Sequence, residues 1–89
     1  MVMVKFFATL QEPVGENKVE IDAKDVSSLL DIILERYPGL KPELLDDEGE
    51  LKDTIKFMLN GRNVDFLDGM ETKLKKDDTV AVFPLVAGG

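Results

Sequence analysis

The sequence predicts a small two-layer α+β domain in which a mixed β-sheet packs on one main helix. Apolar residues alternate with polar ones in several separate stretches, which is the period of a β-strand. One stretch between residues 26 and 37 instead has the spacing of an amphipathic helix. The predicted order is strand, strand, helix, strand, short strand, strand, without repeats or linkers. Such an order places the helix on one face of the sheet.

The N-terminal segment is predicted to form a hairpin. The inward face of its first strand begins with Val2, Val4, Phe6 and Ala8, and the alternation continues to Leu10. The segment from Gln11 to Asn17 contains proline and glycine and is predicted to be a turn. In the second strand, Val19, Ile21 and Ala23 alternate with charged residues. A charged outer face is typical of a strand at the edge of a sheet.

The main helix is predicted to start after Asp25, whose carboxylate can accept a hydrogen bond from the first helical turn. Apolar side chains then recur at helical spacing at Val26, Leu29, Leu30, Ile33, Leu34 and Tyr37, and Ile32 widens this stripe. The helix should end at Pro38-Gly39, because proline disfavours helical geometry in the residue before it. One further helical turn is predicted over residues 40–45.

The second half of the chain is predicted to supply three more strands. Ile55, Phe57 and Leu59 alternate with polar residues and Met58, and Asn60-Gly61 then predicts a tight hairpin turn. Val64 and Phe66 are expected to continue into a short return strand, and Leu74 to fill the core. The last strand, residues 79–87, is rich in valine and bounded by charges, which is typical of a central, buried strand.

The composition argues against a self-contained enzyme. The 89 residues include no cysteine and no histidine, which excludes disulfides, thiolate nucleophiles, Cys/His zinc sites and imidazole bases. The acidic turn at residues 46–50 has Leu51 where a calcium loop needs glycine, so we expect a solvated loop and no metal. No cofactor is expected.

The net charge of −7 bears on partners and location. Lysines and arginines are scattered and form no basic stripe, so neither nucleic acid nor an anionic membrane is an expected partner. An acidic surface favours basic protein partners, although the charge can also serve solubility alone. The chain has no apolar run of membrane-spanning length and no signal-peptide pattern, so we expect a cytoplasmic protein.

The alternation also predicts an apolar patch on the outer face of the sheet. Phe7 lies on the same face of the first strand as Lys5, and Met58 on the same face of the third strand as Lys56. Phe83 and Leu85 occupy the outer face of the last strand. If these strands are neighbours, the four apolar side chains form a contact surface, unless loops or the return strand cover them.

The last two residues, Gly88 and Gly89, are the most informative pair in the chain. A glycine has no Cβ, so a terminal Gly-Gly can carry its carboxylate into a channel that a side chain would block. We therefore expect one folded domain over residues 1–86 and a flexible tail over residues 87–89. Gly89 is the predicted site of chemistry, with Gly88 as its spacer.

Several segments resemble the small subunit of molybdopterin synthase, a family of MoaD-like sulfur carriers. The resemblance rests on Lys5-Phe6-Phe7-Ala8 with Gly15, on residues 59–62 and 74–78, and above all on the Phe-Pro-x-Val-x-Gly-Gly ending of residues 83–89. It spans nearly the whole chain in order. The chain departs from the family pattern at Leu85, where many members have proline, and at Asp77-Asp78, where Gly-Asp is usual.

The resemblance implies the ubiquitin-like β-grasp fold, with the first and last strands parallel at the centre and the third strand beside the last. It would make Phe7, Met58 and Phe83 cross-strand neighbours. It implies that a ubiquitin-activating-type enzyme adenylates Gly89, that sulfur displaces AMP, and that every catalytic side chain belongs to a partner. The thiocarboxylate would then donate sulfur in the large subunit of molybdopterin synthase, where Phe7, Met58, Phe83 and Leu85 anchor the domain. The alternatives are sulfur transfer for thiamin or tRNA thiolation, conjugation of Gly89 to lysines of other proteins, and a plain interaction domain.

Overall fold

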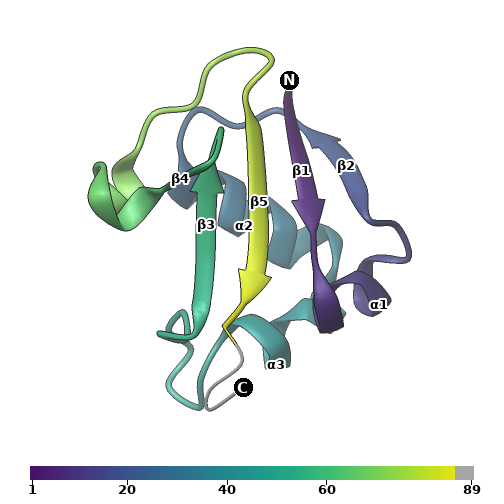
Figure 1. The fold of residues 1–89 in the computed structure, drawn as a ribbon. Helices are drawn as coiled ribbons and strands as arrows, with labels where there is room; N and C mark the ends of the chain where they lie inside the picture. The colour runs from purple at the N-terminus through teal and green to yellow at the C-terminus, as the bar shows by residue number, and fades with distance from the viewer. Residues whose placement is uncertain (86–89) are drawn as a thin grey trace.

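The computed structural model describes residues 1–85, which form a mixed sheet of five strands in the order β2-β1-β5-β3-β4 (Figure 1). The strands are β1 (Val2–Phe6), β2 (Lys18–Ile21), β3 (Ile55–Leu59), β4 (Arg62–Asn63) and β5 (Thr79–Pro84). The helices are α1 (Gln11–Val14), α2 (Val26–Arg36) and α3 (Lys41–Leu44), with 3-10 turns at Ala8–Leu10, Pro38–Leu40, Val64–Phe66 and Gly69–Glu71.

Strand β5 lies in the middle of the sheet and pairs in parallel with β1 and antiparallel with β3. Strand β2 pairs antiparallel with β1 and forms one edge. This order confirms the predicted parallel pairing of the first and last strands. Val80 and Val82 of β5 are fully buried, as expected for a strand with a neighbour on each side.

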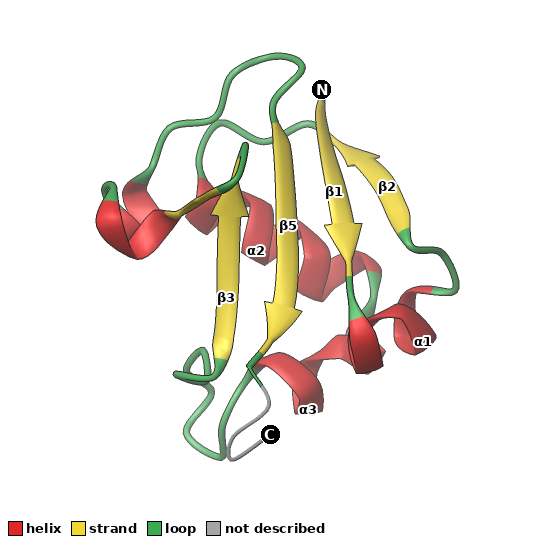
Figure 2. Ribbon diagram, in the orientation of Figure 1, coloured by secondary structure: helices red, strands yellow, loops and turns green. Residues whose placement is uncertain are grey.

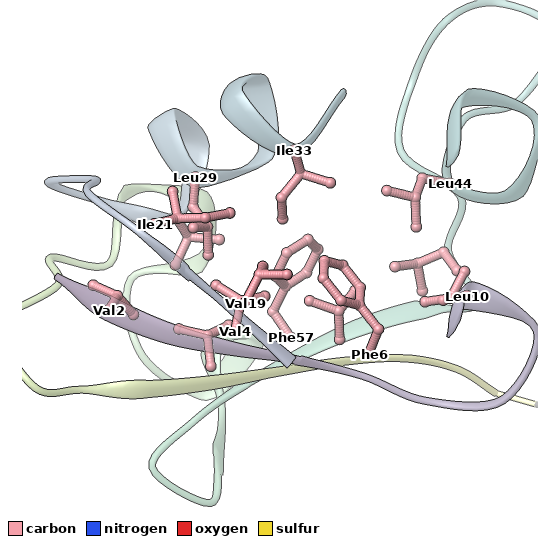
Figure 3. Packing of buried hydrophobic residues seen from close by; sticks show 14 of the residues in the cluster. Val2, Val4, Phe6, Leu10, Val19, Ile21, Leu29, Ile33, Leu44 and Phe57 are labelled. Carbon is pink, nitrogen blue, oxygen red and sulfur yellow. The ribbon is translucent and has the colours of Figure 1, made fainter. Parts of the chain in front are cut away.

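Helix α2 packs across one face of the sheet and leaves the other face without a covering helix (Figure 2). It begins where predicted: the Asp25 carboxylate accepts a hydrogen bond of 2.7 Å from the Ser28 backbone N–H. Leu29 and Ile33 of α2 point toward Phe57 and the other core side chains of the sheet (Figure 3). The fold is therefore two layers around one core, as the sequence predicts.

Three local predictions were wrong. Ala8 is exposed, because the chain leaves β1 after Phe6 and turns at Ala8 with φ of 57°. The predicted turn before Gly15 is the short helix α1. The return strand contains only Arg62–Asn63; Val64 and Phe66 belong to a 3-10 turn in which Val64 is buried and Phe66 is exposed. In the first and third cases the alternation of apolar and polar residues continues by coincidence beyond the strand, whereas the ladder of hydrogen bonds between strands stops.

The turn before β5 contains a backbone conformation that favours glycine. Asp77 has φ of 70°, at the position where the sequence departs from the family's usual Gly-Asp. Replacing Asp77 with glycine removes this strain, so we expect Asp77→Gly to raise the free energy of unfolding by about 0.5 kcal/mol. Asp77→Ala is the matched control and should lower it, because alanine keeps the Cβ and lacks a polar group. Urea denaturation measures both; equal stabilities for the two variants would contradict the assignment of strain.

None of the helices formed within residues 1–85 combines the length and the apolar character that a membrane crossing requires.

Candidate functional site

The candidate site is the outer face of the sheet around β5, the strand that leads to the C-terminal residues. Alternation sends Val80 and Val82 into the core and leaves Ala81 and Phe83 on the face opposite α2. The parallel register pairs Lys5 with Ala81, and the antiparallel register pairs Met58 with Ala81. Ala81 is small, so the centre of this face is low and its apolar neighbours rise around it.

The result is an open apolar hollow of about 590 Å³, which we call the sheet hollow. It is lined by Lys5, Phe7, Ala8, Met58, Asn60, Gly61, Thr79, Ala81, Phe83 and Pro84. Phe7 is 44% exposed, a large exposure for a phenylalanine next to a core. Its N–H donates to the Val82 carbonyl oxygen at 3.1 Å, which holds Phe7 beside β5. Concave apolar surfaces with aromatic walls are typical of protein contact sites.

The structure brings three of the four predicted contact residues to this hollow and leaves one outside it. Phe7, Met58 and Phe83 line the hollow, with Met58 diagonal to Phe83 because its direct partner is Ala81. Leu85 follows the end of β5, is 50% exposed, and is not among the lining residues. Its N–H donates to the Thr54 carbonyl oxygen, which continues the pairing of β5 past Pro84. Gly88 and Gly89, and the proposed boundary after residue 86, lie outside the described residues.

Asn60 also belongs to the site, although the sequence analysis predicted only a hairpin turn for it. It has φ of 49° and, with Gly61 at 88°, forms the turn at the edge of the sheet hollow. Asn60 also ties this turn to β5: its N–H donates to the Thr79 carbonyl oxygen at 2.8 Å, and its side-chain oxygen accepts from the Thr79 N–H at 2.9 Å. The Asn60 amide nitrogen donates to Asp78 at 2.9 Å. One edge of the hollow is thereby fixed by hydrogen bonds.

The Asp78 carboxylate is the charged member of this network. The hydrogen bond from the Asn60 side chain, and next the one from the Lys75 N–H at 2.7 Å, lower the pKa of Asp78 below its ordinary value. In the same way, hydrogen bonds from Ser28 lower the pKa of Asp25. Both carboxylates are favoured in their charged form by folding, so both link stability to pH.

We expect the protein to lose stability in acid through these two groups. A lowered folded-state pKa contributes stability above the unfolded value near 4, and the contribution disappears as the pH falls through the folded pKa. Asp78→Asn should therefore cost about 1 kcal/mol at neutral pH, and this cost should shrink as the pH falls through the folded-state pKa of Asp78, because asparagine cannot titrate. Thermal melts across this pH range measure the difference. Asp47→Asn is the control, since Asp47 accepts no hydrogen bond within residues 1–85; a difference for Asp78→Asn that stays constant with pH would contradict the assignment.

Residues 1–85 lack two common kinds of reactive group, a cluster of metal ligands and an imidazole beside a hydroxyl. They contain no group of three or more metal-ligating side chains, and the whole sequence lacks cysteine and histidine. The hydroxyl side chains therefore have no imidazole beside them to act as a base.

Comparison with known proteins decides the family. The sequence profile of the ThiS family matches residues 4–89, nearly the whole chain and its last residue included. The chain belongs to the ThiS family. The ubiquitin-like β-grasp fold and the recognition of a sulfur-carrier family from sequence are both confirmed.

Three relatives show the range of proteins that this ThiS-family chain resembles. Small archaeal modifier protein 3 of Haloferax volcanii is 43% identical over 89 residues, which cover 97% of this chain and 96% of the relative. The Amycolatopsis orientalis BexX/CysO complex contains a chain with 32% identity and a TM-score of 0.85, with all of both chains covered. A Pyrococcus furiosus protein provisionally named molybdopterin converting factor, subunit 1, has 31% identity and a TM-score of 0.76, covering 96% of this chain and 97% of its own.

These relatives include a modifier, a protein crystallised with a partner and a molybdopterin-type factor, and the two that are solved structures share the fold of this chain. The chain is therefore a ubiquitin-like protein of the sulfur-carrier and small-modifier class. Its specific acceptor is not decided by the family, because relatives of similar identity carry different names.

Proposed function

We propose that this protein carries sulfur as a thiocarboxylate on Gly89. The observation that carries the proposal is the position of the sheet hollow: Thr79, Ala81, Phe83 and Pro84 of β5 line it, and in the sequence this strand lies five residues before Gly89. A partner that binds Phe7, Met58 and Phe83 is thus held next to the segment that leads to Gly88 and Gly89. The match of the ThiS family through residue 89 supports the same site.

The chemistry needs two steps at the Gly89 carboxyl group, the first at an oxygen atom and the second at the carbonyl carbon. A carboxylate is a poor acyl donor, so an oxygen of the Gly89 carboxylate first attacks the α-phosphate of ATP on a ubiquitin-activating-type enzyme and releases pyrophosphate. A sulfide-equivalent nucleophile then attacks the carbonyl carbon of the acyl adenylate, and the C–O bond to AMP breaks. The product is a thiocarboxylate and AMP. The carrier supplies the carboxylate and the docking surface. The enzyme supplies the catalytic side chains and uses ATP, which the cytoplasm provides.

For the acceptor, we propose sulfur donation to a pterin precursor in the large subunit of molybdopterin synthase. The likeness of the C-terminal segment to the small subunit and the molybdopterin-type name of the Pyrococcus furiosus relative support this use. Delivery of sulfur for thiamin or tRNA is the same chemistry with another acceptor. In each case the sheet hollow is the shared docking surface, and Leu85, which follows the lining residue Pro84 in the sequence, is proposed as a further contact.

A second candidate function is conjugation of Gly89 to lysines of other proteins. The relative with 43% identity is a small archaeal modifier, which specifically favours this use. Conjugation and sulfur transfer start from the same adenylate and differ in the nucleophile, an amine in one case and sulfur in the other. One chain can therefore serve both uses, and each requires its own test.

Reconstitution separates the two functions. Thiocarboxylated protein is mixed with the large subunit of molybdopterin synthase and the pterin precursor, and the dithiolene product is measured. We expect sulfur transfer with wild type and none with protein that carries the plain carboxylate. In parallel, proteomics of cells that express the chain identifies any Gly-Gly remnants on lysines. Remnants without sulfur transfer would favour the modifier; absence of both would contradict the molybdopterin acceptor and the modifier function alike.

A further inference from the structure

The outer face of the sheet contains a second, cationic hollow beside the apolar one. It has a volume of about 310 Å³ and is lined by Lys5, Phe6, Phe7, Gln11, Asn17 and Lys18. Its lining includes two lysines and two amides and no carboxylate. Lys5 and Phe7 belong to both hollows, so the cationic hollow borders the apolar surface directly. We call it the cationic rim.

The two lysines of the cationic rim face each other across the strands. The register of β1 and β2 pairs Lys5 directly with Lys18, and both residues are exposed. Like charges in directly opposed positions destabilise a sheet. The ion pairs within residues 1–85 are Lys56–Asp65 and Lys73–Asp25, so neither Lys5 nor Lys18 has a carboxylate partner there.

Carboxylates lie near the rim lysines without forming an ion pair with them in the described residues. Lys5 and Lys18 also line the next hollow, toward Met1, together with Glu20 and Asp77, but neither carboxylate forms an ion pair with either lysine within residues 1–85. Lys56, on the outer face of β3, is already paired with Asp65 at 3.0 Å. The lining of the cationic rim itself is positive, whereas the whole chain has a net charge of −7.

We propose that the cationic rim binds a carboxylate side chain of the protein that docks on the sheet hollow. The proposal rests on the proposed function, in which that protein is the adenylating enzyme. Phe7 and Met58 would fill the apolar centre of the contact, while Lys5 and Lys18 share an aspartate or glutamate at its edge. A carboxylate between the two ammonium groups also removes their mutual repulsion, which gives the complex an advantage that the free carrier lacks. The composition alone favours a basic partner; this face favours one with an acidic edge.

The test compares two double charge reversals that have the same net charge. Lys5→Glu/Lys18→Glu alters the rim, and Lys41→Glu/Lys76→Glu alters two exposed lysines outside both hollows. Affinity for the adenylating enzyme is measured by calorimetry at low and high salt, together with pyrophosphate release. We expect the rim variant to bind about tenfold more weakly or worse at low salt, and the control to change by about twofold at most. The difference in affinity between the rim variant and the control variant should become smaller at high salt, because salt screens the charges.

A neutral variant distinguishes weaker binding from loss of the folded structure. Lys5→Gln/Lys18→Gln removes the like-charge pair, so its melting temperature should equal or exceed that of wild type while its affinity for the enzyme falls. Equal affinities for the rim and control variants would overturn the proposal. If wild-type protein neither binds the enzyme nor supports pyrophosphate release, the proposed function itself fails and the rim proposal falls with it.

Discussion

Removal of Gly88 and Gly89 is expected to abolish adenylation and thiocarboxylate formation without changing the melting temperature. The reacting carboxylate would move to Ala87, whose Cβ adds bulk where the enzyme must thread the chain, and the tail would be two residues shorter. A misplaced reacting group loses the benefit of positioning, which can account for most of a rate enhancement. Pyrophosphate release and intact mass measure the function, and a thermal melt measures the fold.

The matched control for this deletion is the addition of one alanine after Gly89. This variant keeps both glycines and every described residue, and moves only the carboxylate. We expect it to be as inactive as the deletion and as stable as wild type. A deletion variant that still becomes thiocarboxylated would contradict the role of Gly89. A deletion that melts like a variant with a damaged core would show that the last residues belong to the fold.

The second prediction with a large effect is that two adjacent phenylalanines on opposite faces of the sheet differ in their contributions to stability and binding. Phe6 is 1% exposed and meets the Tyr37 ring edge-on at 6.3 Å, whereas Phe7 is 44% exposed in the sheet hollow. We expect Phe6→Ala to lower the free energy of unfolding by about 3–5 kcal/mol, because it leaves a cavity in the core. Phe7→Ala should lower it by less than about 1 kcal/mol.

For binding we expect the opposite: Phe7→Ala should have the larger effect on affinity and Phe6→Ala the smaller. Phe7→Ala removes an aromatic anchor of the docking surface, and we expect affinity for the adenylating enzyme to fall by about tenfold or more. Phe6→Ala is compared only under conditions in which it is shown to be folded, and there its affinity should be close to that of wild type. Urea denaturation and calorimetry supply the two numbers for each variant. If both variants weaken binding equally, the docking surface is not on the outer face.

The elements that follow from the sequence are those whose signal is local. Alternation and helical spacing depend on near neighbours in the chain, so β1, α2, β3 and β5 were predicted with the correct faces. Ala8 and Phe66 were misplaced for the same reason: each continues an apolar alternation beyond the point at which the strand loses its hydrogen-bonding partner. Strand ends depend on pairing, which the pattern of one chain segment does not contain.

Part of the candidate site was also predictable from local patterns in the sequence. The outward positions of Phe7, Met58 and Phe83 follow from alternation, and the structure places all three around one hollow. The hydrogen bonds of Asn60 to Thr79 and Asp78 join residues 18 or more positions apart, so no local pattern predicts them. The same holds for the opposed pair of Lys5 and Lys18, which appears only once the register of β1 and β2 is known. A charge summed over the whole chain conceals such a local reversal of sign.

Intact mass spectrometry of the protein isolated from its own cells tests the central claim most directly. Under sulfur-replete conditions and with the adenylating enzyme present, we predict a fraction in which one oxygen is replaced by sulfur, and fragmentation should assign the change to Gly89. The same preparation from cells without the adenylating enzyme should contain only the unmodified carboxylate. Finding the unmodified carboxylate alone in both preparations would contradict the account of this protein as a sulfur carrier.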